Sequence, residues 1–267
     1  MTERKMGALR SEVDIRDYKF KQAKFMAAVY PETYECPNKM RVRDQGSVGS
    51  CVAYSSSSIL EYHYGETMST NFIYGIHKKL FNSDGPGMFP REACKIIRSY
   101  GDPTYKSCPG NDEVPEAYKI AETAYYSPLV MNEASRYRIS SYARVSSIND
   151  IKYALMHYGP VLGAVIWFSD NKLSPTNVLL KGTFMDGGHA IVIKGWNSEG
   201  WVCQNSWGTG YGDKGTFILP YSYGLFEAYS LIPGAPDEDD IVKPNICNWI
   251  SRIVNAVINF FRKVFHI

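Results

Sequence analysis

The pattern of apolar and polar positions changes near residue 136 of the chain. Before that point, SCVAYSSSSILEYHY (residues 50–64) is rich in apolar and aromatic residues and begins at Ser50, a good N-cap residue, so it predicts a buried helix. Residues 90–98 predict a second helix, because Pro90 stands at its first turn and Gly101 follows as a stop. The first half is therefore expected to be mainly helical.

The second half has the pattern of short strands. Apolar segments rich in β-branched and aromatic residues alternate with glycine and asparagine turns, and they are ASRYRISSYARV, PVLGAVIWF, HAIVIKGW, WVCQNSW and GTFILPY. A short helix is expected between them at residues 147–156, where Ser147 and Asp150 offer a capping arrangement. A helical lobe followed by a β lobe predicts an α+β protein with a cleft between the lobes.

Composition narrows the classes of function. The chain has 267 residues, 45% of them hydrophobic and 21% charged, which suffices for one large core or for two lobes. The formal charge is only +2, and no run of Lys and Arg has aromatic residues interleaved, so a nucleic-acid partner is not expected. Residues 1–20 contain no apolar segment typical of a secretory signal, so export by the usual route is not indicated.

The cysteines are expected to be free thiols. Their spacing is wide and irregular in a chain too long to need disulfide stapling, and they are Cys36, Cys51, Cys94, Cys108, Cys203 and Cys247. The sequence contains no CxxC motif, so neither a zinc site nor a redox pair is suggested, and no metal or organic cofactor is expected. Free thiols favour the cytoplasm or another reducing compartment, with a position at the periphery of a membrane as an allowed variant.

Cys51 is a candidate nucleophile because it opens the helix expected at residues 50–64. The unpaired N–H groups of a helix N-terminus favour a thiolate and lower the pKa of the thiol. A nucleophilic thiol also needs an imidazole. His63 lies on the same helix roughly 18 Å away, too far to reach the thiol. His189 is a better candidate, because it follows a glycine turn and is expected to begin a strand whose end faces the cleft.

Two amide side chains complete the candidate set of catalytic groups. Asn205 ends the next expected strand, where its side chain can accept a hydrogen bond from the imidazole and fix its orientation. Gln45 precedes Cys51 by six residues, and its N–H₂ group, together with the backbone N–H of Cys51, can bind an oxyanion.

With their neighbours, these residues resemble the papain-like cysteine peptidases over about residues 31–232. The motifs are QGSVGSC (residues 45–51), GHAI (188–191) and NSWGTGYGDKG (205–215), in the family's order. The resemblance implies a papain-like two-lobed fold with the active site in the cleft, and cysteine endopeptidase activity on polypeptides. It implies these roles: nucleophile Cys51, general base and acid His189, orienting residue Asn205, oxyanion donor Gln45, and Trp207 as an aromatic cover over the His–Asn hydrogen bond.

The resemblance also suggests where substrate binds and where the chain departs from the family. Secreted members carry a cysteine where this chain has Val48, so a family disulfide is missing. The segment DGPGMFP (residues 84–90) lies where the family has a glycine pair that binds the substrate backbone, with Met88 in place of the second glycine. The expected substrate-binding residues are Gly87, Met88, Gly188 and Trp207.

We expect three regions along the chain. Residues 1–35 form an N-terminal arm or reduced prosegment, whose DIRDY element is similar to one in bacterial and viral members without a long propeptide. Residues 36–235 form the catalytic domain, with a helical lobe at about 40–135 and a β lobe at about 136–235. Residues 236–267 hold an acidic linker and an amphipathic helix. Whether the arm inhibits the enzyme, or is cleaved near Tyr30, is open.

The expected C-terminal helix is not explained by the resemblance. In residues 245–267, apolar residues recur at helical spacing opposite a face with basic residues and asparagines. Arg252 and the asparagines argue against a transmembrane span, which leaves packing on the catalytic domain, contact with a membrane surface, or docking to a protein partner.

Two other functions are compatible with the same motifs. One is a catalytically idle papain-like module that recruits a partner through the C-terminal helix, and the other is a transpeptidase that passes the same thioester to an amine. A dinucleotide site at the GxGxxG match of residues 210–215 is excluded, because a strand and not a helix is expected to follow it.

Overall fold

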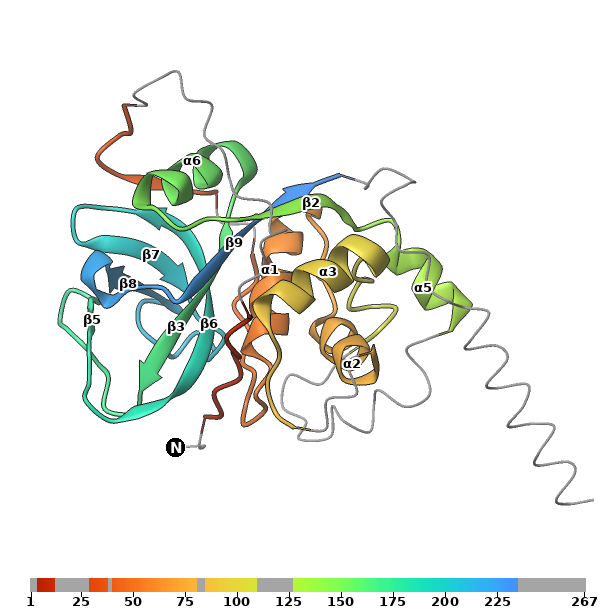
Figure 1. Cartoon of the computed structure of the whole chain (residues 1–267), viewed down its shortest axis with the longest axis horizontal. Helices are drawn as coiled ribbons and strands as arrows, with labels where there is room; N and C mark the ends of the chain where they lie inside the picture. Colours follow the sequence, from red (N-terminus) through yellow and green to blue (C-terminus); the bar gives the residue numbers. More distant parts are fainter. Residues whose placement is uncertain (1–3, 13–28, 38–39, 81–84, 110–126, 235–267) are drawn as a thin grey trace, which may run out of the picture. The chain divides into compact units, whose positions relative to one another are not determined.

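In the computed structural model of the chain, a lobe of helices lies against an antiparallel sheet, and helix α1 (Cys51–Tyr64) lies next to the sheet (Figure 1). The structure describes residues 4–12, 29–37, 40–80, 85–109 and 127–234. The DIRDY element, the acidic linker and the expected C-terminal helix lie outside the described residues.

The helical lobe contains α1, α2 (Thr70–Leu80), α3 (Pro90–Tyr100) and α5 (Pro128–Ala134). The predictions of α1 and α3 are confirmed, and α3 ends at Gly101, whose φ is 80°. Ser50 occupies the N-cap position of α1, but its side chain makes no capping hydrogen bond, because its ψ of 16° is not the extended conformation that capping needs. Among the described residues, no helix is long and apolar enough to cross a membrane.

The main sheet is antiparallel, and its strand order is β2 (Ile139–Arg144), β9 (Glu227–Pro233), β3 (Val161–Phe168), β6 (Met185–Trp196), β7 (Gly200–Gln204) and β8 (Thr216–Pro220), with β1 (Tyr34–Glu35) paired to β6. The smaller elements are α6 (Ile148–Tyr158), β4 (Lys172–Leu173), β5 (Leu179–Leu180) and the 3₁₀ turn Tyr221–Tyr223. The five predicted strands and the capping box of α6 are confirmed. β8 directly follows the glycine-rich turn at residues 210–215, as expected.

One expectation about β6 is wrong. The strand begins at Met185, so His189 lies inside it and not at its start. The reason is that β3 continues to pair with the glycines before His189, with Trp167 opposite Gly187 and Ile166 opposite Gly188. The residues before and after His189 in the sequence consequently both pair with β3 in a regular ladder. This pairing fixes the backbone of His189 more firmly than a position at a strand end would.

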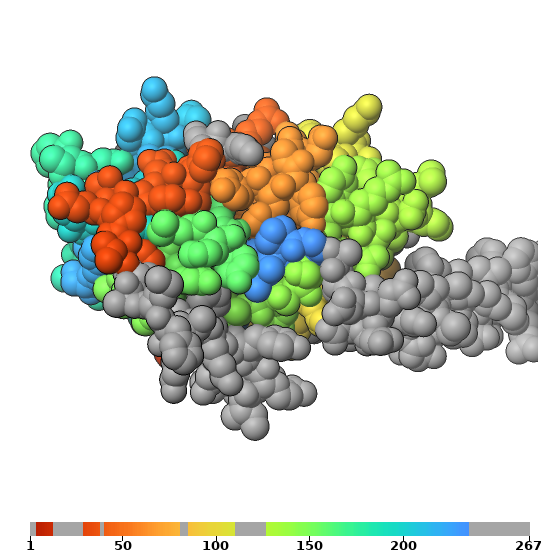
Figure 2. Space-filling model, turned by 90° about the horizontal axis from the view of Figure 1, so that it is seen from above, coloured from red at the N-terminus to blue at the C-terminus, as the bar shows by residue number. Residues whose placement is uncertain are grey.

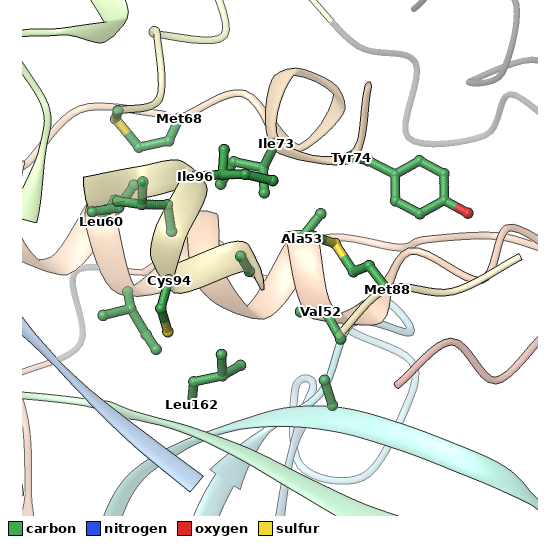
Figure 3. Close-up of a cluster of buried hydrophobic side chains, with 14 of the residues drawn as sticks. Val52, Ala53, Leu60, Met68, Ile73, Tyr74, Met88, Cys94, Ile96 and Leu162 are labelled. Carbon is green, nitrogen blue, oxygen red and sulfur yellow. The ribbon is translucent and has the colours of Figure 1, made fainter. Parts of the chain in front are cut away.

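The sheet separates two hydrophobic cores. Along β3, Leu162 and Ala164 pack with the helices, whereas Val161 and Val165 pack on the other side of the strand, as the period of a strand requires. Figure 3 shows the first core around α1, with Val52, Ala53 and Leu60 of α1 near residues from α2, α3 and the sheet.

The N-terminal region does not lie entirely on the surface. Residues 4–12, dark red in Figure 1, pass between α1 and β6, and Ala8 is only 5% exposed. Residues 29–37 then lie beside α6 (Figure 2), where the Tyr34 hydroxyl donates to the carbonyl of Leu155. The chain therefore contributes to both lobes before it reaches Cys51.

A buried ion pair fixes the segment that leads into the nucleophile turn. Arg43 Nη2 lies 2.5 Å from Glu61 Oε1 near the end of α1, and both side chains are buried. Arg43 Nη1 also donates to the carbonyl of Met68 (2.8 Å), and Glu61 accepts the backbone N–H of Arg41 (2.9 Å). The pair joins the entry of the turn to the far end of the helix that the turn begins.

We expect Arg43→Met to lower the free energy of unfolding by about 3–5 kcal/mol, because it leaves the Glu61 carboxylate buried without its cation. Urea denaturation measures this change. Arg41→Met is the matched control, since the Arg41 side chain is exposed and its loss should cost less than about 0.5 kcal/mol. Equal stabilities of the two variants would contradict the prediction.

Candidate active site

The turn before Cys51 pairs with the backbone that follows Asn205. The Gln45 N–H donates to the carbonyl of Ser206 (2.8 Å), and the Gly208 N–H donates to the carbonyl of Arg43 (3.0 Å). Together they form an antiparallel bridge between Asp44 and Trp207. The bridge holds two segments in register that are far apart in the sequence, since Gln45 and Ser206 are separated by 161 positions.

Cys51 is the first residue of α1 and is fully buried. Its Sγ accepts the backbone N–H of Ala190, the residue after His189, at 3.4 Å. Burial raises the pKa of the Cys51 thiol to about 11, which outweighs the lowering by backbone N–H groups of Ala190 and Gly7. The expectation of a lowered pKa from the helix N-terminus alone is therefore wrong for this state of the site, because the sulfur is cut off from water.

His189 is oriented by Asn205. Its Nε2 lies 2.8 Å from Asn205 Oδ1, an atom that also accepts the backbone N–H of Ser206 at 2.8 Å. Because a backbone N–H can only donate, the shared atom is the amide oxygen, and Nε2 carries the proton. Nδ1 is buried and has no hydrogen-bond partner in the described part of the chain, so its lone pair is the one available for a proton. Burial lowers the pKa of His189 to about 4.

Aromatic rings enclose this imidazole. The Trp207 ring centroid lies 4.8 Å from that of His189, at an interplanar angle of 32°. Trp167 of β3 meets His189 edge-on, with centroids 5.1 Å apart, and also contacts Trp207. The expected place of Trp207 next to the histidine is observed. Trp167 was not singled out from the sequence, where it looks like one more core residue of an apolar strand.

Gln45 is almost fully buried, with both ends of its amide in use. Oε1 accepts the hydroxyl of Ser206 (2.6 Å), whereas Nε2 donates to the carbonyls of Val48 (2.8 Å) and Lys5 (3.2 Å). The Lys5 carbonyl belongs to the N-terminal segment, so the amide already faces a peptide carbonyl in the cleft. Ser206 fixes the orientation of the amide, and only its place beside Asn205 could have pointed to it.

The three backbone positions expected to bind substrate all contact residues 4–12. Met88 donates its N–H to the carbonyl of Gly7 (2.8 Å) and accepts the N–H of Leu9 (3.0 Å). The carbonyl of Gly188 accepts the N–H groups of Gly7 (3.0 Å) and Ala8 (2.8 Å). A Cβ on Gly87 would lie 2.8 Å from the Gly7 carbonyl oxygen, so this close approach requires glycine.

Met88 in place of a second glycine does not block this pairing. Its side chain is fully buried and turns into the core beside Val52 and Ala53, as Figure 3 shows, while its N–H and C=O remain on the cleft side. The departure from the family pattern is thus absorbed by the helical core, and the backbone keeps its binding function toward the segment that fills the cleft.

Polar contacts hold the segment on either side of the cysteine. Arg4 makes a two-pronged ion pair with Asp44, in which Nη2 lies 2.7 Å from Oδ2. Burial alone would raise the pKa of Asp44, but hydrogen bonds from Arg4 and Gly46 outweigh it, and the pKa is lowered. Further along, the Ser11 N–H donates to the buried carboxylate of Glu227 (3.1 Å).

The segment is not presented to the sulfur as a substrate. Ala8 and Met88 form a parallel bridge, and the N–H of Gly7, which donates to the carbonyl of Gly188, also acts on the Cys51 sulfur. Nucleophilic attack requires a carbonyl carbon at that place. With a thiol whose pKa is raised and an imidazole whose pKa is lowered, both groups are neutral near pH 7 while residues 4–12 occupy this place.

The assembled groups have the chemistry of acyl transfer. A thiol, an imidazole with one free nitrogen, an amide that orients it and a second amide aimed at a carbonyl meet at one place between the lobes. His63 is not part of the site, since its Nε2 contacts the carbonyl of Leu231 at 3.2 Å.

Comparison with known proteins gives a consistent result. A family model described as "Papain family cysteine protease" matches residues 30–224. A cysteine protease of Blomia tropicalis is 26% identical over 209 residues, which is 69% of this chain and 60% of the relative's length. An uncharacterised peptidase C1-like protein of Acanthamoeba polyphaga mimivirus is 25% identical, with 82% of each chain covered. This chain thus spans less than two thirds of the length of the Blomia protein.

Solved structures agree on the fold. Xylellain, a cysteine protease from Xylella fastidiosa, superposes with a TM-score of 0.73 at 24% identity, covering 87% of this chain and 98% of that one. The procathepsin B S9 structure from Trypanosoma congolense gives a TM-score of 0.66 at 18% identity, with 86% and 87% covered. The likeness extends through both lobes, which confirms the expected two-lobed α+β fold.

Displacing the N-terminal segment should activate the thiol. A Cβ at Gly7 would lie 2.1 Å from the carbonyl oxygen of Gly49, so Gly7→Val cannot keep the segment in place. We expect alkylation of Cys51 by iodoacetamide at pH 7 to become at least about tenfold faster in the variant, because solvent returns the thiol toward its ordinary pKa.

The pH profile gives the sign of this effect. In the wild type, alkylation should keep rising with pH toward the thiol pKa of about 11, whereas in Gly7→Val the rise should begin at lower pH. Arg10→Ala, in the same segment but with an exposed side chain, is the control and should behave like the wild type. Identical rates for Gly7→Val and wild type at every pH would refute the assignment.

Proposed function

The chain belongs to the papain family of cysteine proteases, and on that premise we propose that it is a cysteine endopeptidase that hydrolyses polypeptides through Cys51, His189 and Asn205. The observation that carries the proposal is the hydrogen bond between His189 Nε2 and Asn205 Oδ1. This hydrogen bond orients the imidazole and leaves Nδ1 as its free nitrogen. His189 also directly precedes Ala190, whose N–H contacts Cys51 Sγ.

In the proposed mechanism, Nδ1 of His189 takes the proton of the Cys51 thiol, and the sulfur attacks the peptide carbonyl carbon. The resulting oxyanion is stabilised by Gln45 Nε2 and the backbone N–H of Cys51. The tetrahedral intermediate collapses to a thioester as the C–N bond breaks and the leaving amine takes the proton from Nδ1. Water then gives a proton to Nδ1 and attacks the thioester carbon. The C–S bond breaks, the acid is released, and the sulfur takes the proton from Nδ1, which restores the thiol and the neutral imidazole.

Residues 4–12 act as an inhibitor in this proposal. They occupy the backbone groups of Met88 and Gly188 and the amide of Gln45, which a substrate would need. Substrate hydrolysis therefore requires that the segment leave the cleft, either by reversible release or by cleavage. The parallel direction and the N–H facing the sulfur support release without cleavage at this place.

The same thioester could be passed to an amine, which would make the chain a transpeptidase, and an idle binding module is the alternative from another class. The complete set of groups at the site argues against the idle module. Water and an amine attack the same thioester, so the products of the reaction decide between hydrolysis and transfer.

We expect a thiol-directed epoxide to label the wild type and not Cys51→Ala, and a peptide library to be cleaved with the same dependence. Asn205→Ala should lower kcat by about 10²-fold, because the imidazole loses its orienting partner. Asn132→Ala, with an exposed side chain far from these contacts in sequence, is the control and should match the wild type.

Each alternative has its own outcome. Ligated products in place of hydrolysed ones would favour the transpeptidase. Absence of any labelling or cleavage that depends on Cys51, also in the Gly7→Val background, would favour the idle module and reject the proposed function.

We also propose that residues 245–267 bind a membrane surface, on the strength of their amphipathic pattern with basic residues on the polar face. Co-sedimentation with liposomes containing anionic lipids should be stronger for the full chain than for a chain ending at Ala235. Equal partitioning of the two would reject membrane binding and leave packing on the catalytic domain or a protein partner.

A further inference from the structure

The substrate-binding loop Gly85–Met88 needs a precise backbone orientation but has no covalent support in the described part of the chain. The loop lies against the nucleophile turn, since a Cβ on Gly49 would be 3.3 Å from Gly87 N and from Pro86 Cβ. Every cysteine among the described residues is a free thiol. The orientation of the loop must therefore come from noncovalent contacts.

Lys78 supplies these contacts from α2. Its side chain is 9% exposed, and Nζ donates to the carbonyl of Gly85 (2.6 Å) and to that of Gly87 (2.6 Å). Nζ also lies 4.7 Å from the ring centroid of Tyr74, one turn earlier on the helix. The Tyr74 hydroxyl in turn accepts the N–H of Gly87 at 3.4 Å. A buried ammonium needs such partners, so the lysine and the loop carbonyls hold each other in place.

The geometry of one peptide unit connects this contact to the cleft. The carbonyl of Gly87 and the N–H of Met88 belong to the same planar, trans peptide, so they point in opposite directions. Lys78 holds the carbonyl toward α2, and the N–H consequently points into the cleft, where it donates to the Gly7 carbonyl at 2.8 Å. Gly87 has a φ of 89° and no side chain to resist rotation, so the peptide unit would be free to turn without the lysine.

We propose that Lys78, supported by Tyr74, is a positioning residue that presents the Met88 N–H to the substrate backbone. The inference rests on the proposed function, because it assumes that a bound peptide pairs with Met88 at the position that residues 7–9 occupy in this structure. In the sequence, Lys78 is one of two adjacent lysines at the end of an amphipathic segment and resembles ordinary surface charge.

The test compares two reagents that alkylate Cys51 in the full-length protein. A peptidyl epoxide needs the backbone of the subsites, whereas iodoacetamide does not. Both reagents need the N-terminal segment to leave the cleft, so any effect of a variant on that segment cancels in the ratio of their second-order rate constants. The ratio therefore reports the subsite backbone alone, and a general loss of structure would change both rates together.

We expect Lys78→Met to lower the ratio of epoxide to iodoacetamide rates by about tenfold, since hydrogen bonds from a charged donor are lost. Lys78→Arg, which can still donate to two carbonyls, should restore the ratio to within about threefold of the wild type. Lys79→Met is the matched control, because Lys79 is the exposed neighbour on the same helix, and it should leave the ratio unchanged.

An unchanged ratio in Lys78→Met, with a thermal transition like that of Lys79→Met, would overturn the inference. If Lys78→Met fails to fold, Lys78→Gln, which keeps an amide donor, should lower the ratio by about threefold, and no change there would overturn it equally. The two proposals fail separately: a wild type that hydrolyses no peptide rejects the proposed function, whereas an active wild type with an insensitive ratio rejects only the role of Lys78.

Discussion

The site depends on the backbone bridge between Asp44 and Trp207. Cys51 starts a helix of one lobe, whereas His189 and Asn205 lie on or directly after strands of the other, so no local structure brings them together. The bridge fixes the register between the two parts, and the hydroxyl of Ser206 then locks the amide of Gln45. Because peptide hydrogen bonds are directional, the bridge sets the position of the sulfur and of the oxyanion donor in one step. The side-chain chemistry is added to a frame made by the main chain.

A filled cleft changes the electrostatics of this frame. A helix N-terminus favours a thiolate, but it acts on a sulfur that residues 4–12 help to seal from water, and desolvation is the larger effect. The same burial lowers the pKa of His189, so the pair rests as a neutral thiol and a neutral imidazole. The segment can be accommodated because Gly7, Gly87 and Gly188 lack side chains at its closest approaches. In the proposed function, occupying the cleft thus blocks substrate and also keeps the proton on sulfur.

Much of the site could be predicted from the sequence, for reasons that differ between residues. Cys51, His189 and Asn205 stand in local motifs with the family's order, and the structure brings them together with Gln45. The strands and α1 have clear periodicity, whereas α2 was missed although Phe72, Ile73 and Ile76 lie on its buried side. Contacts between segments distant in sequence left no local signal: the path of residues 4–12 and the partners of Lys78 depend on how the lobes meet. The position of His189 within β6 depends on pairing with β3, which no pattern inside β6 reveals.

The missing disulfide at Val48 and the buried Lys78 both concern one requirement, a fixed orientation of the loop Gly85–Met88. A loop that must present one N–H to a peptide needs its carbonyls held elsewhere, and a family disulfide is one way to restrict such a segment. Here the restriction comes from α2, and it is only as firm as α2 itself. That helix is fixed in turn by His77, the neighbour of Lys78. The Nε2 atom of His77 lies 2.6 Å from the Glu92 carboxylate on α3. The orientation of the substrate-binding backbone is therefore connected, through a chain of buried polar contacts, to the packing of the helical lobe. A subsite can be defined in this way without a disulfide, since hydrogen bonds from a buried ammonium need no oxidising compartment.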